Sequence, residues 1–261
     1  MKQRILTAVI GIIVVAPIIV YGNWPFMILA YLLATIALFE MIRMYKPSIH
    51  FIYFFISLLF LWFILVPTTE ISIYGYTMSK LNLLLVLAIL LLVMMVFSKN
   101  KFNFDQASFV FFATVYVGMS FYFVIDTRMM GLALFLFILF IIWATDSGAY
   151  FIGKFLGKRK LWPSISPNKT IGGAVGGIIF ALIVAGIFQL VYPFEHSFIM
   201  ILILAAAISI IGQIGDLVAS AMKRHYDIKD FGNIFPGHGG ILDRFDSLLF
   251  VTFVLHVVQL I

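Results

Sequence analysis

The sequence predicts an all-α, polytopic integral membrane protein. Of its 261 residues, 64% are hydrophobic and only 11% are charged, and Phe alone supplies 29. This composition lies outside the range of soluble globular domains. The apolar residues also gather into runs of about 20, the length that an α-helix needs to cross a bilayer. We therefore expect a single membrane-embedded domain over residues 1–261, with no soluble module.

The apolar runs predict about nine membrane-spanning helices. The first run follows Lys2 and Arg4 and is similar to a signal peptide, but no clear small-x-small site ends it, so we expect it to remain as a span. Residues 1–130 would hold the N-terminal helices, and residues 131–261 the remaining helices with two polar loops, 146–170 and 216–242. In chain order the spans are expected at residues 5–21, 24–42, 50–67, 80–97, 107–125, 129–145, 171–192, 197–216 and 243–261.

The positions of the cations predict the orientation of these spans. Cytoplasmic loops carry an excess of Lys and Arg. With the N-terminus in the cytoplasm, all but two of the 17 Lys and Arg residues fall on the cytoplasmic side, the exceptions being Lys80 and Arg128. Both long polar loops fall on the same side. We therefore expect a multi-pass protein of the cytoplasmic membrane whose chemistry faces the cytoplasm. The absence of cysteine excludes disulfides and thiolate sites.

Four aspartates are predicted at the cytoplasmic ends of spans. Asp243 and Asp246 are three residues apart, so at the start of a helix they share one face and can bind or bridge a hard cation such as Mg²⁺. Asp216 and Asp146 end two other apolar runs. For one such residue, a structural ion pair or simple hydration is the better interpretation. Four of them on one side, beside glycine turns and cations, favour a metal or substrate site.

The two polar loops contain residues suited to binding phosphate. The turn at residues 236–240 (PGHGG) cannot be regular helix, and its backbone N–H groups could bind an anion before a helix start. Within it, His238 could be a general base, a phosphate donor or a plain hydrogen-bond partner. Lys169 and Thr170 precede the span at 171–192 and also suit phosphate.

The other charged residues are candidates either for phosphate contacts or for simpler roles. Lys223 and Arg224 precede the acidic part of their loop and are good candidates for holding a phosphate. The basic run at residues 153–160 (GKFLGKRK) is equally suited to anionic lipid headgroups. Glu40 and Arg43, three residues apart at the end of a span, are expected to form a local ion pair.

Taken together, these motifs resemble a known family. The pattern Ser220-x-x-Lys223-Arg224, Lys229-Asp230, Pro236-x-His238-Gly239-Gly240-x-x-Asp243-Arg244-x-Asp246 resembles the signature of phosphatidate cytidylyltransferases. Asp146-Ser147-Gly148-Ala149-Tyr150, Ser166-Pro167-x-Lys169-Thr170 and Gly215-Asp216 are similar to that family too. The resemblance spans roughly residues 143–247 and involves many positions at fixed spacing. One departure is Ile171, where an aromatic residue is expected.

The resemblance implies the reaction CTP + phosphatidate → CDP-diacylglycerol + diphosphate, with Mg²⁺ as cofactor. It also implies a homodimer and no nucleic-acid partner. The family's metal-binding carboxylates correspond to Asp216, Asp243 and Asp246, and its important lysine to Lys223. The expected catalytic residues are Lys223, Asp243, Asp246 and His238. The expected substrate-binding residues are Lys169, Thr170, Ser166, Arg224, Gly239, Gly240, Arg244 and Asp146.

Two other functional classes fit less well. A CDP-alcohol phosphotransferase needs glycine directly after an Asp-x-x-Asp pair, whereas Ser247 follows Asp246 here. A transporter usually carries ionisable residues at mid-membrane and often shows repeated halves. In this chain the charges gather in two loops on one side, which favours an enzyme.

Overall fold

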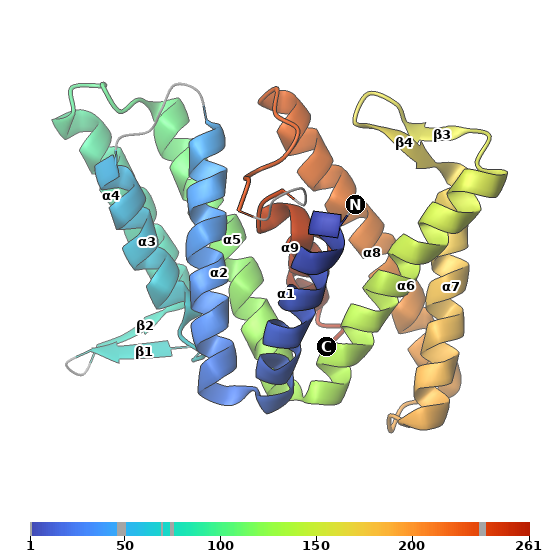
Figure 1. The fold of residues 1–261 in the computed structure, drawn as a ribbon. Helices are drawn as coiled ribbons and strands as arrows, with labels where there is room; N and C mark the ends of the chain where they lie inside the picture. The colour runs from blue at the N-terminus through green and yellow to red at the C-terminus, as the bar shows by residue number, and fades with distance from the viewer. Residues whose placement is uncertain (1, 46–50, 69, 74–75, 235–238) are drawn as a thin grey trace. The chain divides into compact units, whose positions relative to one another are not determined.

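The chain forms nine α-helices and two β-hairpins within the residues that the computed structural model describes, which are 2–45, 51–68, 70–73, 76–234 and 239–261 (Figure 1). These elements group into two compact units. Unit 1 comprises Met1–Asp126 and Asp230–Leu242. Unit 2 comprises Thr127–Lys229 and Asp243–Ile261. The predicted division of the chain at residue 130 stays a prediction.

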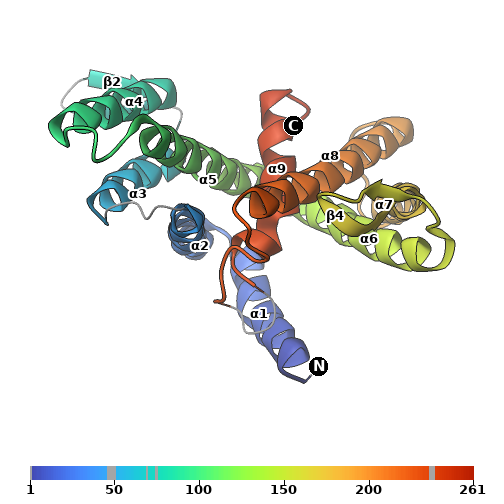
Figure 2. The same cartoon turned by 90° about the horizontal axis from the view of Figure 1, so that it is seen from above.

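Unit 1 is built from a row of helices. Successive helices pack side by side from α1 to α4, and an apolar core cluster joins α3 and α4 to Phe102 and to the start of α5 (Figure 2). Its core includes Phe60, Leu87 and Phe102. The elements are α1 (Lys2–Tyr21), α2 (Asn23–Met44), α3 (Phe51–Leu65), β1 (Glu70–Ile73), β2 (Tyr76–Ser79), α4 (Lys80–Phe97) and most of α5 (Phe104–Met130).

Lys80, one of the two cations predicted outside the cytoplasm, has a structural role in unit 1. Its ammonium group donates to the backbone oxygens of Ile64 and Val66, at 2.7 and 2.9 Å. It also lies 3.9 Å from the centre of the Tyr122 ring. A cation at the last carbonyls of a helix satisfies backbone acceptors and complements the helix dipole. Lys80 therefore fastens the start of α4 to the end of α3.

Unit 2 contains α6 (Leu132–Leu156), β3 (Lys160–Trp162), β4 (Ser166–Thr170), α7 (Ile171–Val191), α8 (Phe198–His225) and α9 (Leu242–Val257). The antiparallel hairpin of β3 and β4 lies at the ends of α6 and α7 (Figures 1 and 2). Thr170 ends β4 and also caps α7, since its side chain accepts the N–H of Gly173 at 3.1 Å. This cap fixes the angle between the hairpin and the helix.

Helices α6 and α7 approach each other closely because small residues lie between them. A Cβ atom built at Gly176 would overlap the side chain of Ile152, and one at Gly148 would overlap Phe180. Glycines at such positions let two helix backbones come near enough for extensive van der Waals contact, as is common inside membranes. This packing holds the hairpin and the helix ends in one arrangement.

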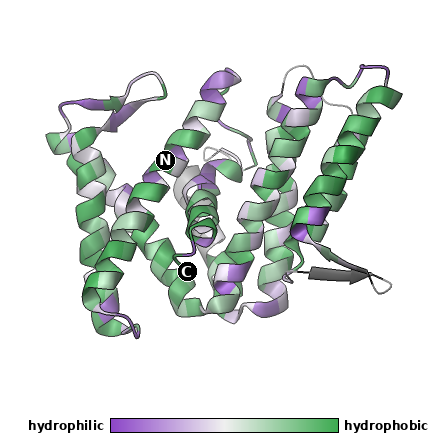
Figure 3. Ribbon diagram, turned by 180° about the vertical axis from the view of Figure 1, so that it is seen from behind, coloured by the Kyte–Doolittle hydropathy of each residue, from purple (hydrophilic) through white to green (hydrophobic). Residues whose placement is uncertain are grey.

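The protein is a helical membrane protein, as the sequence predicts. Six helices in the described part of the chain are long and apolar enough to span a bilayer, namely α2, α4, α5, α6, α7 and α8, while α3 is a shorter apolar helix. In Figure 3 the helix shafts are mostly hydrophobic, and the β3–β4 hairpin is largely hydrophilic.

Two predicted boundaries need correction. The predicted loops at 146–170 and 216–242 both begin as helix, because α6 continues to Leu156 and α8 to His225. Asp146 and Asp216 therefore lie within helices. Hydropathy marks where a helix leaves the apolar layer, whereas backbone hydrogen bonding continues until a cap or a glycine ends the helix. Neither the β1–β2 nor the β3–β4 hairpin is predicted by the hydropathy pattern.

Candidate active site

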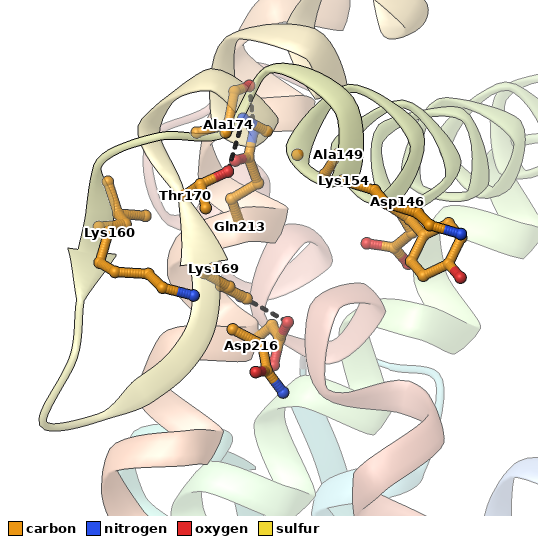
Figure 4. Close-up of a pocket in the computed structure, with 15 residues that line it drawn as sticks. Asp146, Ala149, Lys154, Lys160, Lys169, Thr170, Ala174, Gln213 and Asp216 are labelled. Atoms are coloured by element: carbon orange, nitrogen blue, oxygen red, sulfur yellow. Dashed lines mark hydrogen bonds and ion pairs between the residues drawn. The ribbon is translucent and has the colours of Figure 1, made fainter.

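A cavity of about 650 Å³ in unit 2 brings together residues from α6, α7, α8 and both strands of the β3–β4 hairpin (Figure 4). Helix α6 contributes Asp146 and Lys154, the hairpin contributes Lys160 and Lys169, and α8 contributes Asp216. Its size lies within the usual range of small-molecule sites, roughly 300–1,000 Å³. Three lysines and two aspartates line it, so the cavity suits a polyanion and the cation that would accompany it.

An ion pair links the hairpin to α8 inside this cavity. Lys169 Nζ lies 2.5 Å from Asp216 Oδ2, and about a third of each side chain is exposed. The Ser220 hydroxyl, one turn further along α8, donates to Asp216 Oδ1 at 3.4 Å. Two of the predicted site residues, 47 positions apart in the sequence, are thus in direct contact. Their partial exposure leaves both accessible from the cavity.

A polar network lies beside the ion pair. Gln213 donates from Nε2 to the Ala174 backbone oxygen at 3.3 Å and to the Ser209 hydroxyl at 3.4 Å. The buried Thr145 and Ser209 hydroxyls are hydrogen-bonded to each other at 2.9 Å. These contacts cross-link α6, α7 and α8 next to the cavity. Because Gln213 lies three residues before Asp216, the network also fixes the face of α8 from which Asp216 projects.

A second ion pair joins α8 to α9. Lys223 Nζ lies 2.6 Å from Asp243 Oδ1, and the two side chains are only 12% and 3% exposed. One turn along α9, Asp246 accepts the N–H of Ser247 through Oδ1 at 2.7 Å. Asp146, Asp216 and Asp246 are close enough for their charges to interact, and Lys169, Lys223 and Arg244 contribute opposite charge. Three of the four predicted aspartates, Asp146, Asp216 and Asp246, therefore form one acidic region, while Asp243 is paired with Lys223.

These carboxylates fit a hydrated divalent cation better than a closed metal cage. Within the described residues, no group of three or more His, Asp and Glu lies close enough together to hold a metal ion. Mg²⁺ commonly keeps several waters and is bound by one or two carboxylates together with substrate phosphates. Asp216 and Asp246, with hard oxygen donors and neighbouring negative charge, meet that requirement.

The remaining predicted residues that the structure describes do not line the cavity. Ser166 begins β4, while Arg224 and Arg244 are exposed on α8 and α9. Arg224 donates to the Ile228 backbone oxygen at 3.2 Å. Gly239 and Gly240 belong to unit 1, where they are buried. His238 lies outside the described residues.

Sequence reasoning missed three features of the site. Gln213 and Asn168 line the cavity, and Lys160, considered equally suited to lipid headgroups, lines it as well. The signal for Gln213 was a polar side chain in an apolar run, one helical turn from Asp216. Glu40 was expected to pair with Arg43, yet Arg43 is exposed and the buried Glu40 carboxylate binds the backbone of Ile241 and Leu242.

Comparisons with known proteins agree with the motifs. A family model described as "Cytidylyltransferase family" matches residues 2–261. Phosphatidate cytidylyltransferase from Bacillus subtilis (strain 168) is 49% identical over 254 residues, which cover 96% of this chain and 94% of that protein. The proteins of the same name from Staphylococcus saprophyticus and Staphylococcus aureus (strain COL) are 43% and 42% identical, and each match covers 98% of both chains. The similarity thus includes the N-terminal half, where no motif was found.

Proposed function

This chain belongs to the cytidylyltransferase family, and we propose that it transfers the cytidylyl group of CTP to phosphatidate, releasing diphosphate and forming CDP-diacylglycerol. The observation that carries this proposal is the near-full-length identity to enzymes named phosphatidate cytidylyltransferase, at 49% for the Bacillus subtilis protein. The cavity supports it as well, because its lining of three lysines and two aspartates suits phosphate groups.

The proposed reaction is an in-line displacement at phosphorus. An oxygen of the phosphatidate phosphate attacks the α-phosphorus of CTP, a new P–O bond forms, and the bond to the β-phosphate oxygen breaks as diphosphate leaves. A phosphate monoester is already anionic near neutral pH, so no strong base is needed. The main barrier is the repulsion between two polyanions, and catalysis therefore depends on positive charge held in fixed positions.

The cavity lysines meet this need for CTP. Lys154 of α6, Lys160 of β3 and Lys169 of β4 line one cavity, which favours several contacts to a triphosphate. The Thr170 hydroxyl accepts from Gly173, which keeps its own hydrogen available for donation to a phosphate oxygen. Lys169 and Thr170 directly precede the first residue of α7, where the helix dipole also favours an anion.

We propose Mg²⁺ as the cofactor, held by Asp216 and Asp246 with Asp243 beside them. When bound, the ion would neutralise phosphate charge and stabilise the leaving diphosphate. Lys223 holds the Asp243 carboxylate in place through their short contact. Lys169, which contacts Asp216, is placed to reach phosphate oxygens from the same position. His238 is kept as a candidate catalytic residue.

The proposed function also requires a membrane topology that brings the site to the side where CTP is found. We propose about nine spans, a cytoplasmic N-terminus, a cytoplasm-facing site and a homodimer. The absence of cysteine allows single-cysteine labelling without background. In intact cells, an impermeant thiol reagent should label Glu195→Cys, on an external connection, and not Ser164→Cys, in the β3–β4 hairpin. The reverse result would overturn the orientation, and light scattering in detergent would test the dimer.

The decisive experiment is conversion of phosphatidate in detergent micelles with CTP and Mg²⁺. We expect CDP-diacylglycerol and an equal amount of diphosphate, and neither product with EDTA or without lipid. A transporter would release no diphosphate. A folded protein that makes no product from several phosphatidate species would disprove the proposed substrate, and other lipid phosphates would then be tested.

A further inference from the structure

Glu40 is a buried carboxylate that contacts a part of the chain 200 residues away. It lies near the end of α2 and is only 3% exposed. Its two oxygens accept the backbone N–H groups of Ile241 and Leu242, each at 3.0 Å. All three residues belong to unit 1. A buried carboxylate is rare unless hydrogen bonds or a cation compensate for its lost hydration, and here two backbone donors do so.

Two glycines pack against the same carboxylate. A Cβ atom built at Gly232 would overlap the Glu40 side chain, and one at Gly240 would overlap both carboxylate oxygens. For each glycine, the three nearest atoms all belong to Glu40. The main chain at residues 232 and 240–242 therefore closes around a single side chain, and a Cβ atom at either glycine would have to displace the Glu40 carboxylate.

The position of Glu40 corresponds to an anion site at a helix start. Leu242 is the first residue of α9, and the first N–H groups of a helix lack partners within it. A carboxylate there is favoured by hydrogen bonding and by the helix dipole. The sequence predicted an anion at the backbone N–H groups of the turn at residues 236–240, and this stays a prediction. The N–H groups that bind Glu40 belong to Ile241 and Leu242, directly after that turn.

We propose that Glu40 is a positioning residue for cytidylyl transfer. It holds the main chain that carries Gly239 and Gly240, and the next residue after Leu242 is Asp243, the partner of Lys223. Glu40 thus acts through the backbone and sets where α9 begins. This inference rests on the proposed function, since it assigns a role in that reaction to a residue outside the signature.

The first test compares Glu40→Gln with the wild-type enzyme. Glutamine keeps the size but replaces one acceptor oxygen with an NH₂ group, which faces a backbone donor. Because small displacements of reacting groups cost up to about 100-fold in rate, we expect kcat to fall about 10- to 100-fold while KM for CTP changes less than about threefold. Hydrogen–deuterium exchange should quicken in the peptide that contains Ile241 and Leu242. Glu195→Gln, an exposed acid, is the matched control and should change neither.

Two results would overturn this role. One is a kcat within about twofold of wild type for folded Glu40→Gln. The other is a lower melting temperature together with an unchanged kcat per folded molecule, which would make Glu40 purely structural.

A second test does not depend on activity. Gly232→Ala should lower the melting temperature, because the new methyl group meets the carboxylate, and Glu40→Ala should relieve that clash in the double variant. Additive effects of the two changes would contradict the contact. If the wild-type protein makes no CDP-diacylglycerol, the proposed function fails, while exchange and the double-variant comparison still decide whether Glu40 holds the loop.

Discussion

The Lys223 ammonium group lies 2.6 Å from the Asp243 carboxylate and joins the last turn of α8 to the first turn of α9. Both side chains are largely buried, so solvent screens the pair only weakly. The resemblance to the family implies that Asp243 is a metal ligand and that Lys223 corresponds to the family's important lysine. Their contact means that each side chain fixes the orientation of the other.

Replacing Lys223 with methionine should therefore damage both stability and turnover. Removing one partner of a buried ion pair costs about 3–5 kcal/mol, because the other charge stays buried without its counter-ion. We expect a lower melting temperature in detergent and a loss of turnover. Adding Asp243→Asn should restore part of the melting temperature but no activity, whereas Lys101→Met, at an exposed lysine outside the signature, should change neither. A fully active Lys223→Met enzyme would exclude the proposed role.

Asp246→Asn should abolish turnover in a folded, membrane-inserted protein. The substitution keeps size and removes the negative charge that a metal ion needs, and we expect a fall on the order of 1,000-fold or more. Mn²⁺ binding, followed by electron paramagnetic resonance, should weaken in parallel. Asp227→Asn is a suitable control, since Asp227 is exposed and its φ of 54° suits Asn equally well. Near-normal Mg²⁺-dependent activity of Asp246→Asn would mean that the metal assignment is wrong.

Lys169→Gln should impair CTP binding. A charge-assisted hydrogen bond contributes about 1.5–3 kcal/mol, so loss of one phosphate contact should raise KM for CTP on the order of 10- to 100-fold. Steady-state kinetics at saturating phosphatidate would measure this. Lys158 is an exposed lysine just before the same hairpin, and it does not line the cavity. Lys158→Gln should therefore leave KM for CTP unchanged. Equal effects of the two substitutions would indicate a general electrostatic contribution instead of a specific contact.

Gly176→Ala should destabilise unit 2. Its methyl group would overlap Ile152 across the α6–α7 interface, and overpacking of this kind costs about 1–3 kcal/mol. Gly186 lies on the same helix, where a Cβ atom meets only the Phe198 ring at an ordinary 3.7 Å. Gly186→Ala should therefore be neutral or slightly stabilising in thermal unfolding. If both variants melt alike, close α6–α7 packing does not limit stability.

Much of the fold follows from local sequence. An apolar run of about 20 residues has few alternatives to a membrane helix, because its backbone must bond internally in lipid. The span predicted at 80–97 coincides with α4. Helix ends were harder to predict, since α6 and α8 continue past their apolar segments into polar residues that still bond within the helix.

The sequence by itself determined the membrane class, the motifs that place the chain in its family, and the aspartates and lysines that carry charge near the site. Only the tertiary structure decided how these charges are paired: Lys169 with Asp216, and Lys223 with Asp243. It alone showed that Glu40 binds the backbone of Ile241 and Leu242. Spacing along a chain predicts contacts within one helix turn, whereas partners dozens to hundreds of residues apart meet only through packing, which local patterns do not record.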